Sequence, residues 1–344
     1  MTFNPAMLGT MLKYQENLND VFDPAWRTNR HRYLRAAGVE CAELMDDYEH
    51  HDLRTAVVEC SKLIEHTGYK WWKKAPQNNE AQLKDDMIRL LRALLSSGTD
   101  HEDLLNTHDL DNLTIQFDWR EYRVGLLSTL EKMDLMMGLC SAGRISYPLF
   151  QAIWVDLGHT LEGLPTVSDV LAINVAKKTH AMDIKQMMLE VVDMAHFLLS
   201  EVARDMNDPE AAKAKLLTLW ANTESVVNFD GKHYDLDAVD AFTRMDLMVG
   251  LCCSGRINFE LYRRIMVDIG LSFPSLYRMY AAKNVLNLFR QHNGDKQGTY
   301  IKVWMGREDN VYLAELMETW TEAEGMDVLY ARLADCYKEF ALQA

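Results

Sequence analysis

The chain has 344 residues, of which 48% are hydrophobic and 25% charged, and a formal net charge of −15 at pH 7. This composition is typical of a globular protein with enough apolar material for one large domain or two smaller ones. The negative charge and the lack of a basic stripe argue against a nucleic acid polymer as partner. No signal peptide and no apolar run of membrane-spanning length is evident, so we expect a cytoplasmic protein with no membrane partner.

Apolar residues recur every three or four positions over long stretches, which predicts a mostly helical fold. The six cysteines show neither the CxxC spacing of a metal site nor a compact disulfide framework. We therefore expect reduced and mostly buried thiols.

The first informative helix is predicted around VECAELMDD (39–47), where Glu40 and Glu43 stand three residues apart. That spacing places both carboxylates on one helix face, among apolar neighbours. A related segment, VECSKLIEH (58–66), follows in the chain. In this second segment Glu59 takes the place of Glu40, but Lys62 takes the place of Glu43.

Further along, MIRLLRALLSS (87–97) aligns with VVDMAHFLLSE (191–201) at an offset of 104. The alignment sets Asp86 opposite Glu190 and Arg89 opposite Asp193. Residues 133–158 then repeat at 245–270, with 15 of 26 positions identical at a constant offset of 112. The shared Gly-Arg-Ile and Val-Asp-x-Gly turns favour a true duplication over simple repetition of an amphipathic hairpin, which stays the alternative.

The order of these segments predicts an insertion. Residues 53–178 form a degenerate copy, or pseudo-subunit, of a unit made by residues 1–52 and 179–344. Each degenerate helix has exchanged one carboxylate for a cation, so we expect no metal site of the same kind in the insert.

The second complete acidic pair is Glu190 and Asp193, again within an apolar helix. Each pair taken alone is better explained by a helix with solvated or salt-bridged acids than by a metal site. Burial of four carboxylates is costly unless a cation lies between them, and hard oxygen ligands suit Mg²⁺ beside substrate phosphates. The sequence therefore predicts a metal-dependent enzyme that acts on a phosphate ester or anhydride.

Two other segments carry binding chemistry. GYKWWKK (68–74) sets two tryptophans among lysines, which suits either a stacking wall for a base or a helix end anchored by aromatic packing. The segment 283–310 concentrates basic residues around a Gly-rich turn. This combination favours a phosphate-binding segment over a basic surface loop that binds no ligand.

Together these motifs resemble the all-α dimeric dUTPases, a branch of the all-α nucleoside triphosphate pyrophosphohydrolases. The resemblance rests on YQENLND, ECAEL, YKWWK, LEVVDMAHFLLS and KNVLNLFRQHNGDKQGTYIKVWMGREDN. It implies an all-α helical bundle, here with an inserted degenerate repeat. The chain departs from the family pattern where YEHHDLR follows ECAEL, because relatives usually join ECAEL directly to the tryptophan stretch.

The resemblance also implies roles for particular residues. The Mg²⁺ ligands would be Glu40, Glu43, Glu190 and Asp193. Base and sugar contacts would come from Gln15, Asn19, Trp72, His196, Phe197 and Asn287. Phosphate contacts would come from Lys283, Arg290 and Lys302, and the tryptophan stretch would place Lys70 near a phosphate.

The predicted reaction is Mg²⁺-dependent hydrolysis of dUTP to dUMP and pyrophosphate, with Glu43 as general base. The alternatives are cleavage of dCTP or a modified pyrimidine nucleotide, and a non-catalytic protein that senses nucleotides or binds a regulator. Because the insert resembles a second subunit fused into the chain, we expect a monomeric pseudo-dimer rather than a homodimer.

Overall fold

The computed structural model describes residues 3–29, 32–46, 53–67, 80–97, 108–172, 184–204, 206, 208–321 and 324–341. The protein is built almost entirely of helices, as predicted. Its longer helices are α1 (Pro5–Phe22), α2 (Tyr33–Asp46), α3 (Leu53–His66), α4 (Glu80–Ser97), α6 (Thr129–Ser141), α7 (Tyr147–Asp156), α9 (Ile184–Arg204), α10 (Pro209–Ala221), α11 (Ala241–Cys253), α12 (Phe259–Asp268), α13 (Phe273–His292), α14 (Asp309–Thr319) and α15 (Met326–Ala341).

Shorter elements connect these helices. They are the hairpins β1–β2 (Thr114–Phe117, Arg120–Arg123), β3–β4 (Val226–Phe229, Lys232–Asp235) and β5–β6 (Val303–Trp304, Arg307–Glu308), the six-residue helix α8 (Val167–Ala172) and the turns η1 (Val124–Leu126) and η2 (Leu161–Gly163). No helix in the described part of the chain combines the length and apolar character needed to cross a bilayer. The six cysteines are free thiols, four of them buried.

Local signals in the sequence set several helix boundaries. Pro209 stands at the start of α10, and the side chain of Asp208 caps that helix by accepting from the Glu210 N–H. Helix α6 begins with a capping box between Ser128 and Glu131. These caps satisfy N–H groups that have no partner inside the helix, so each helix starts at a defined residue.

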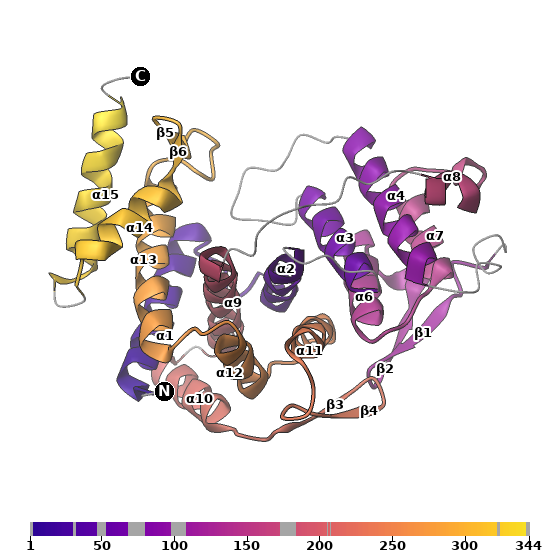
Figure 1. Ribbon diagram of the computed structural model, residues 1–344, viewed down its shortest axis with the longest axis horizontal. Coiled ribbons are helices and arrows are strands. Elements are labelled where there is room, and N and C mark those ends of the chain that lie inside the picture. Colours follow the sequence, from indigo (N-terminus) through magenta and orange to yellow (C-terminus); the bar gives the residue numbers. More distant parts are fainter. Residues whose placement is uncertain are drawn as a thin grey trace.

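The two copies lie side by side (Figure 1). On one side α2 packs against α9 and α11, and on the other side α3 packs against α4 and α6. Corresponding thiols make corresponding contacts: Cys41 Sγ lies 3.6 Å from the Met245 carbonyl and Cys60 Sγ lies 3.3 Å from the Met133 carbonyl. The duplication in the sequence is thus a duplication of the fold, and α6 of one copy packs against α11 of the other.

The hairpins of the two copies are joined by reciprocal contacts. The Asp118 N–H donates to Asp230 Oδ1 at 2.9 Å, and the Asp230 N–H donates to Asp118 Oδ1 at 3.1 Å. Arg144 pairs with Asp230 and Arg256 pairs with Asp118, each at 3.0 Å. Both aspartates have positive φ, at 50° and 46°, a conformation that Asp adopts more readily than most residues. Such exchange of equivalent contacts is what a two-fold interface requires.

Close packing where α6 meets α11 depends on two equivalent glycines. A Cβ on Gly138 would lie 2.5 Å from the ring of Phe117, and one on Gly250 would lie 2.2 Å from the ring of Phe229. The two rings also contact each other edge to face, with centroids 5.7 Å apart. Only glycine at both positions allows α6 and α11 to approach the rings this closely.

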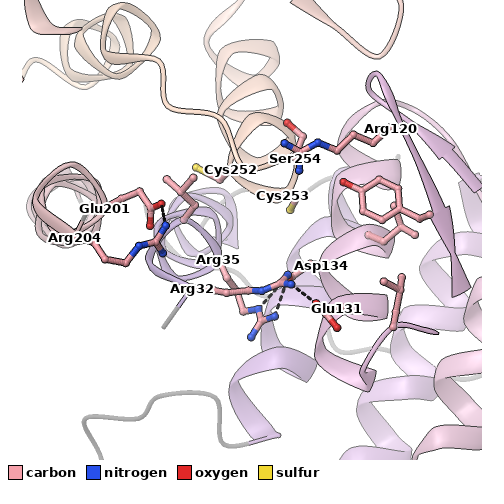
Figure 2. Close-up of a pocket in the computed structure, with 15 residues that line it drawn as sticks. Arg32, Arg35, Arg120, Glu131, Asp134, Glu201, Arg204, Cys252, Cys253 and Ser254 are labelled. Atoms are coloured by element: carbon pink, nitrogen blue, oxygen red, sulfur yellow. Dashed lines mark hydrogen bonds and ion pairs between the residues drawn. The ribbon is translucent and has the colours of Figure 1, made fainter. Parts of the chain in front are cut away.

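Ion pairs also cross between the copies. Arg35 of α2 forms a bidentate pair with Asp134 of α6, both bonds 2.7 Å long (Figure 2). At the equivalent place Arg54 of α3 reaches Asp246 of α11 at 2.8 Å. Because Asp134 is only 7% exposed, the pair with Arg35 supplies the partner that a buried carboxylate needs.

The two copies differ at their outer ends. The first unit adds α1 and the twenty-residue α13, which pack together and against α9, and α14 and α15 then cover α13 (Figure 1). In the described part of the insert, α7 is followed only by η2 and the short α8. The elements that enclose the site described below therefore belong to one copy.

Candidate functional site

A cavity of about 230 Å³ opens between α1, α2, α9 and α13, beside the loop that follows α13. Its wall contains every predicted site residue that the structure describes. These are Gln15, Asn19, Glu40, Glu43, Glu190, Asp193, His196, Phe197, Lys283, Asn287, Arg290 and Lys302. The cavity thus brings together residues that lie more than 280 positions apart in the sequence.

One side of the cavity is acidic. Glu40, Glu190 and Asp193 each present a carboxylate oxygen within 4.8 Å of the others, in a group that could hold a metal ion. Glu43 lines the same wall without belonging to this group. Three oxygen donors at this spacing, held on two packed helices, match the donor set of a hard divalent cation.

The electrostatics of this group reflect crowding of like charges. Burial, together with the nearby Asp193 and Glu43 carboxylates, raises the pKa of Glu190 to about 7. The pKa of Asp193 is lowered instead: burial opposes the shift, but the ammonium of Lys283, 3.0 Å away, outweighs it. A cation beside these groups stabilises their charged forms, and Lys283 supplies one such charge.

A chain of hydrogen bonds joins four further residues of the cavity wall, Gln15, Asn19, His196 and Ser200. Gln15 Nε2 donates to Asn19 Oδ1 at 2.9 Å, and Asn19 Nδ2 donates to Ser200 Oγ at 3.1 Å. Gln15 Oε1 lies 2.7 Å from both His196 Nδ1 and the hydroxyl of Tyr280. All five residues are buried. A neutral, well-ordered polar wall of this kind suits a nucleobase rather than a phosphate.

The third side is basic. Arg290 forms a bidentate pair with the fully buried Asp309, at 2.8 and 2.7 Å, and Tyr300 donates a further bond to the same carboxylate. Asp309 thereby holds the guanidinium in one orientation at the cavity wall. Lys302 is half exposed and lies 3.5 Å from Glu308. Positive groups held in place around an open space suit phosphate oxygens.

Two predicted residues, Lys70 and Trp72, lie outside the described residues. Conversely, the structure adds residues that the sequence reading did not single out: Gln186, which donates to Glu190, and Ser200, Tyr280 and Asp309. Helical spacing offered a signal for Ser200, which stands one turn after His196. No local pattern marks Tyr280 or Asp309, because their importance arises from contacts between distant segments.

The equivalent place in the insert is neutralised by its own side chains. Arg89 contacts both Glu59, at 3.2 Å, and Asp86. Lys62 Nζ lies 3.0 Å from Glu59 Oε1. His66 Nδ1 approaches the fully buried Asp86 to 2.6 Å. Two cations therefore occupy the neighbourhood that the first copy leaves to carboxylates, as the sequence predicts.

A second cavity, of about 320 Å³, lies where the copies meet (Figure 2). Four arginines line it, but Arg35 is paired with Asp134 and Arg204 with Glu201. This second cavity is lined by polar residues of both copies, and its lining includes none of the carboxylates of the acidic group.

Comparison with known proteins agrees with this architecture. No curated protein matches the chain. A family profile described as dUTPase matches residues 7–133 and 175–294, which is more than half of the chain and includes both acidic helices and most of the cavity wall. The chain therefore belongs to this family of all-α dUTPases, and its activity is that of a dUTP diphosphatase.

Proposed function

We propose that the enzyme hydrolyses dUTP to dUMP and pyrophosphate with Mg²⁺ held by Glu40, Glu43, Glu190 and Asp193. One observation carries the proposal. The acidic group, the neutral polar residues and the basic residues all line a single cavity, so that a metal ion, a nucleobase and phosphates can be held together there, as such a reaction needs.

The donor set fits the metal. Three carboxylate oxygens lie within 4.8 Å of one another, and burial, followed by the nearby Asp193 and Glu43 carboxylates, raises the pKa of Glu190. Bound Mg²⁺ would neutralise charge on the phosphates and acidify an attacking water. The free energy lost by crowding the carboxylates is then recovered when the cation binds.

The other residues have separate roles in this proposal. Glu43 lies beside the acidic group and accepts the proton of the attacking water as general base. Lys283, Arg290 and Lys302 hold phosphate oxygens, with Asn287 near the sugar. Gln15, Asn19, His196 and Phe197 surround the base. For Trp72 and Lys70, which lie outside the described residues, we keep the roles of a stacking partner for the base and a phosphate contact.

The test is pyrophosphate release from dUTP, dCTP and dTTP, each with Mg²⁺ and with a chelator. We expect release from dUTP that stops when the metal is removed. Preferential cleavage of dCTP would show that dCTP, not dUTP, is the substrate. Activity that persists without divalent metal would show that Mg²⁺ is not required. Binding of dUTP with no turnover of any nucleotide would favour the role of a nucleotide sensor.

We also propose that residues 53–178 act as a pseudo-subunit within the chain. In this proposal helices α3, α4 and α6 stand in for the helices of a partner, and the packing of α6 on α11 and the reciprocal Asp118–Asp230 contacts support it. The insert then serves as scaffold for the single complete site.

A further inference from the structure

The hydrogen-bond chain beside the base wall has a direction. Ser200 Oγ donates its one proton to the backbone carbonyl of His196 at 2.8 Å, and a carbonyl oxygen can only accept. Ser200 Oγ is therefore the acceptor for Asn19 Nδ2. With its Nδ2 bound to Ser200, Asn19 presents Oδ1 to Gln15 and accepts from Gln15 Nε2. The other amide atom of Gln15, Oε1, then faces the imidazole of His196.

The direction fixes the tautomer of His196. Because Gln15 Oε1 only accepts, Nδ1 of His196 carries the proton. Burial lowers the pKa of the ring to about 4, so the imidazole is neutral at pH 7 and Nε2 is an acceptor. Nε2 is buried and has no hydrogen-bond partner among the described residues.

We propose that Ser200 is a positioning residue that sets base specificity through this chain, an inference that rests on the proposed function. With Ser200 in place, Nε2 of His196, a residue of the cavity wall, accepts a hydrogen bond from the base. Uracil offers such a donor at N3, whereas N3 of cytosine is itself an acceptor. Two lone pairs facing each other in a buried site disfavour the cytosine nucleotide.

The chain has a second possible direction, which is why Ser200 matters. Ser200 Oγ also lies 3.4 Å from Asn19 Oδ1, and the hydroxyl of Tyr280 lies 3.2 Å from the Met11 carbonyl. If both amides turned over, Tyr280 would donate to Met11 and Gln15 Nε2 would donate to His196 Nδ1. Nε2 would then carry the proton and would match N3 of cytosine. The shorter bond from Ser200 to the His196 carbonyl favours the first direction.

The test combines two measurements on Ser200→Ala. Nitrogen NMR of the nucleotide-free protein reports which imidazole nitrogen of His196 is protonated. Steady-state kinetics give kcat/KM for dUTP and dCTP. We expect Nδ1–H in the natural protein. In Ser200→Ala we expect a mixture of tautomers and a ratio of kcat/KM for dUTP over dCTP that falls at least about tenfold, with the Mg²⁺ dependence unchanged.

Two further variants control for packing. Ser200→Thr keeps the hydroxyl and should keep both the tautomer and the substrate ratio. Asn19→Asp presents only acceptors, so adding it to Ser200→Ala should force Gln15 Nε2 towards residue 19 and restore Nδ1–H. An Nε2–H tautomer in the natural protein, or no change of tautomer and ratio in Ser200→Ala, would overturn the proposal. The NMR result stands even if no nucleotide is cleaved, which separates this failure from that of the proposed function.

Discussion

At the level of single residues, the two acidic centres differ in what neutralises them. Among the described residues, Lys283 forms an ion pair with Asp193 in the first centre. In the second centre, Arg89 and His66 both contact Asp86. The first centre keeps an excess of negative charge, which a divalent metal can balance. The second centre is already balanced.

This difference predicts opposite outcomes for matched substitutions. Glu190→Ala or Asp193→Ala should lower kcat/KM for dUTP by at least about 100-fold, because removal of a ligand forfeits charge stabilisation worth several kcal/mol. Asp86→Ala should change the activity per folded molecule by no more than about twofold. Asp86→Ala should instead lower the free energy of unfolding by about 1–3 kcal/mol, because Arg89 and His66 lose their buried partner.

Measuring the melting temperature and the activity of each variant separates the loss of stability from the loss of activity. Equal loss of activity in Asp86→Ala and Glu190→Ala, at a temperature where both are folded, would mean that the second centre takes part in the reaction.

His196 predicts a pH dependence of stability. Its pKa is about 4 when folded, because of burial, against an ordinary value of 6.5. As the pH falls, the unfolded chain binds this proton first, so the stabilisation is complete above 6.5 and is lost between 6.5 and 4. At about 1.4 kcal/mol per pKa unit, the loss is roughly 3 kcal/mol. Denaturant unfolding at several pH values should show a shallower slope over this range for His196→Gln than for the natural protein.

The acidic group was predictable from sequence because its signal is local: carboxylates three apart on apolar helices. The orientation of the base wall was not, because it depends on contacts between α1, α9 and α13. Tyr280 illustrates this, since its ring stacks on His196 with centroids 4.1 Å apart although 84 residues separate them.

At the level of elements, α3 and α4 correspond in sequence to α2 and α9, which carry the proposed metal ligands, but their side chains have changed. Arg89 reaches both Glu59 and Asp86, so those two carboxylates already converge. Lys62 and Arg89 stand where the first copy has Glu43 and Asp193.

Restoring both acids should therefore recreate a metal site. We expect Lys62→Glu with Arg89→Asp to bind more Mn²⁺ per chain than the natural protein in calorimetric titration, and its melting temperature to rise with the metal. The control, Lys62→Gln with Arg89→Asn, removes the cations without adding carboxylates and should bind no extra metal. Equal stoichiometry in all three proteins would show that the helices of the insert no longer hold a site of this geometry.

The helices and the hairpins differed in how well the sequence predicted them. Long amphipathic helices such as α9 repeat their apolar pattern over several turns, which made them identifiable. The four-residue strands of β1–β2 and β3–β4 are too short for a period of two to be distinctive. Their turns also differ, with Asp-Trp in one and Asp-Gly in the other, so only the repeat itself linked them.

At the level of the whole molecule, the contacts between copies have the character of a subunit interface contained within one chain. Phe117 and Phe229 are buried against each other, and Arg35 and Arg54 form corresponding ion pairs across the boundary. Within the described residues, the contacts that a two-fold interface would make between two chains are thus made between the two copies of one chain.

We therefore predict a monomer of 39.6 kDa that binds one nucleotide. The insert has balanced charges where the first unit has its acidic group, and in its described part α7 is followed only by η2 and the short α8, where the first unit has the long α13. Light scattering should give the mass of one chain, and calorimetric titration with a non-hydrolysable dUTP analogue should give one site per chain. A stable dimer would mean that the insert enlarges each subunit without replacing the partner, and two nucleotides per chain would mean that the second centre still binds substrate despite Lys62 and Arg89.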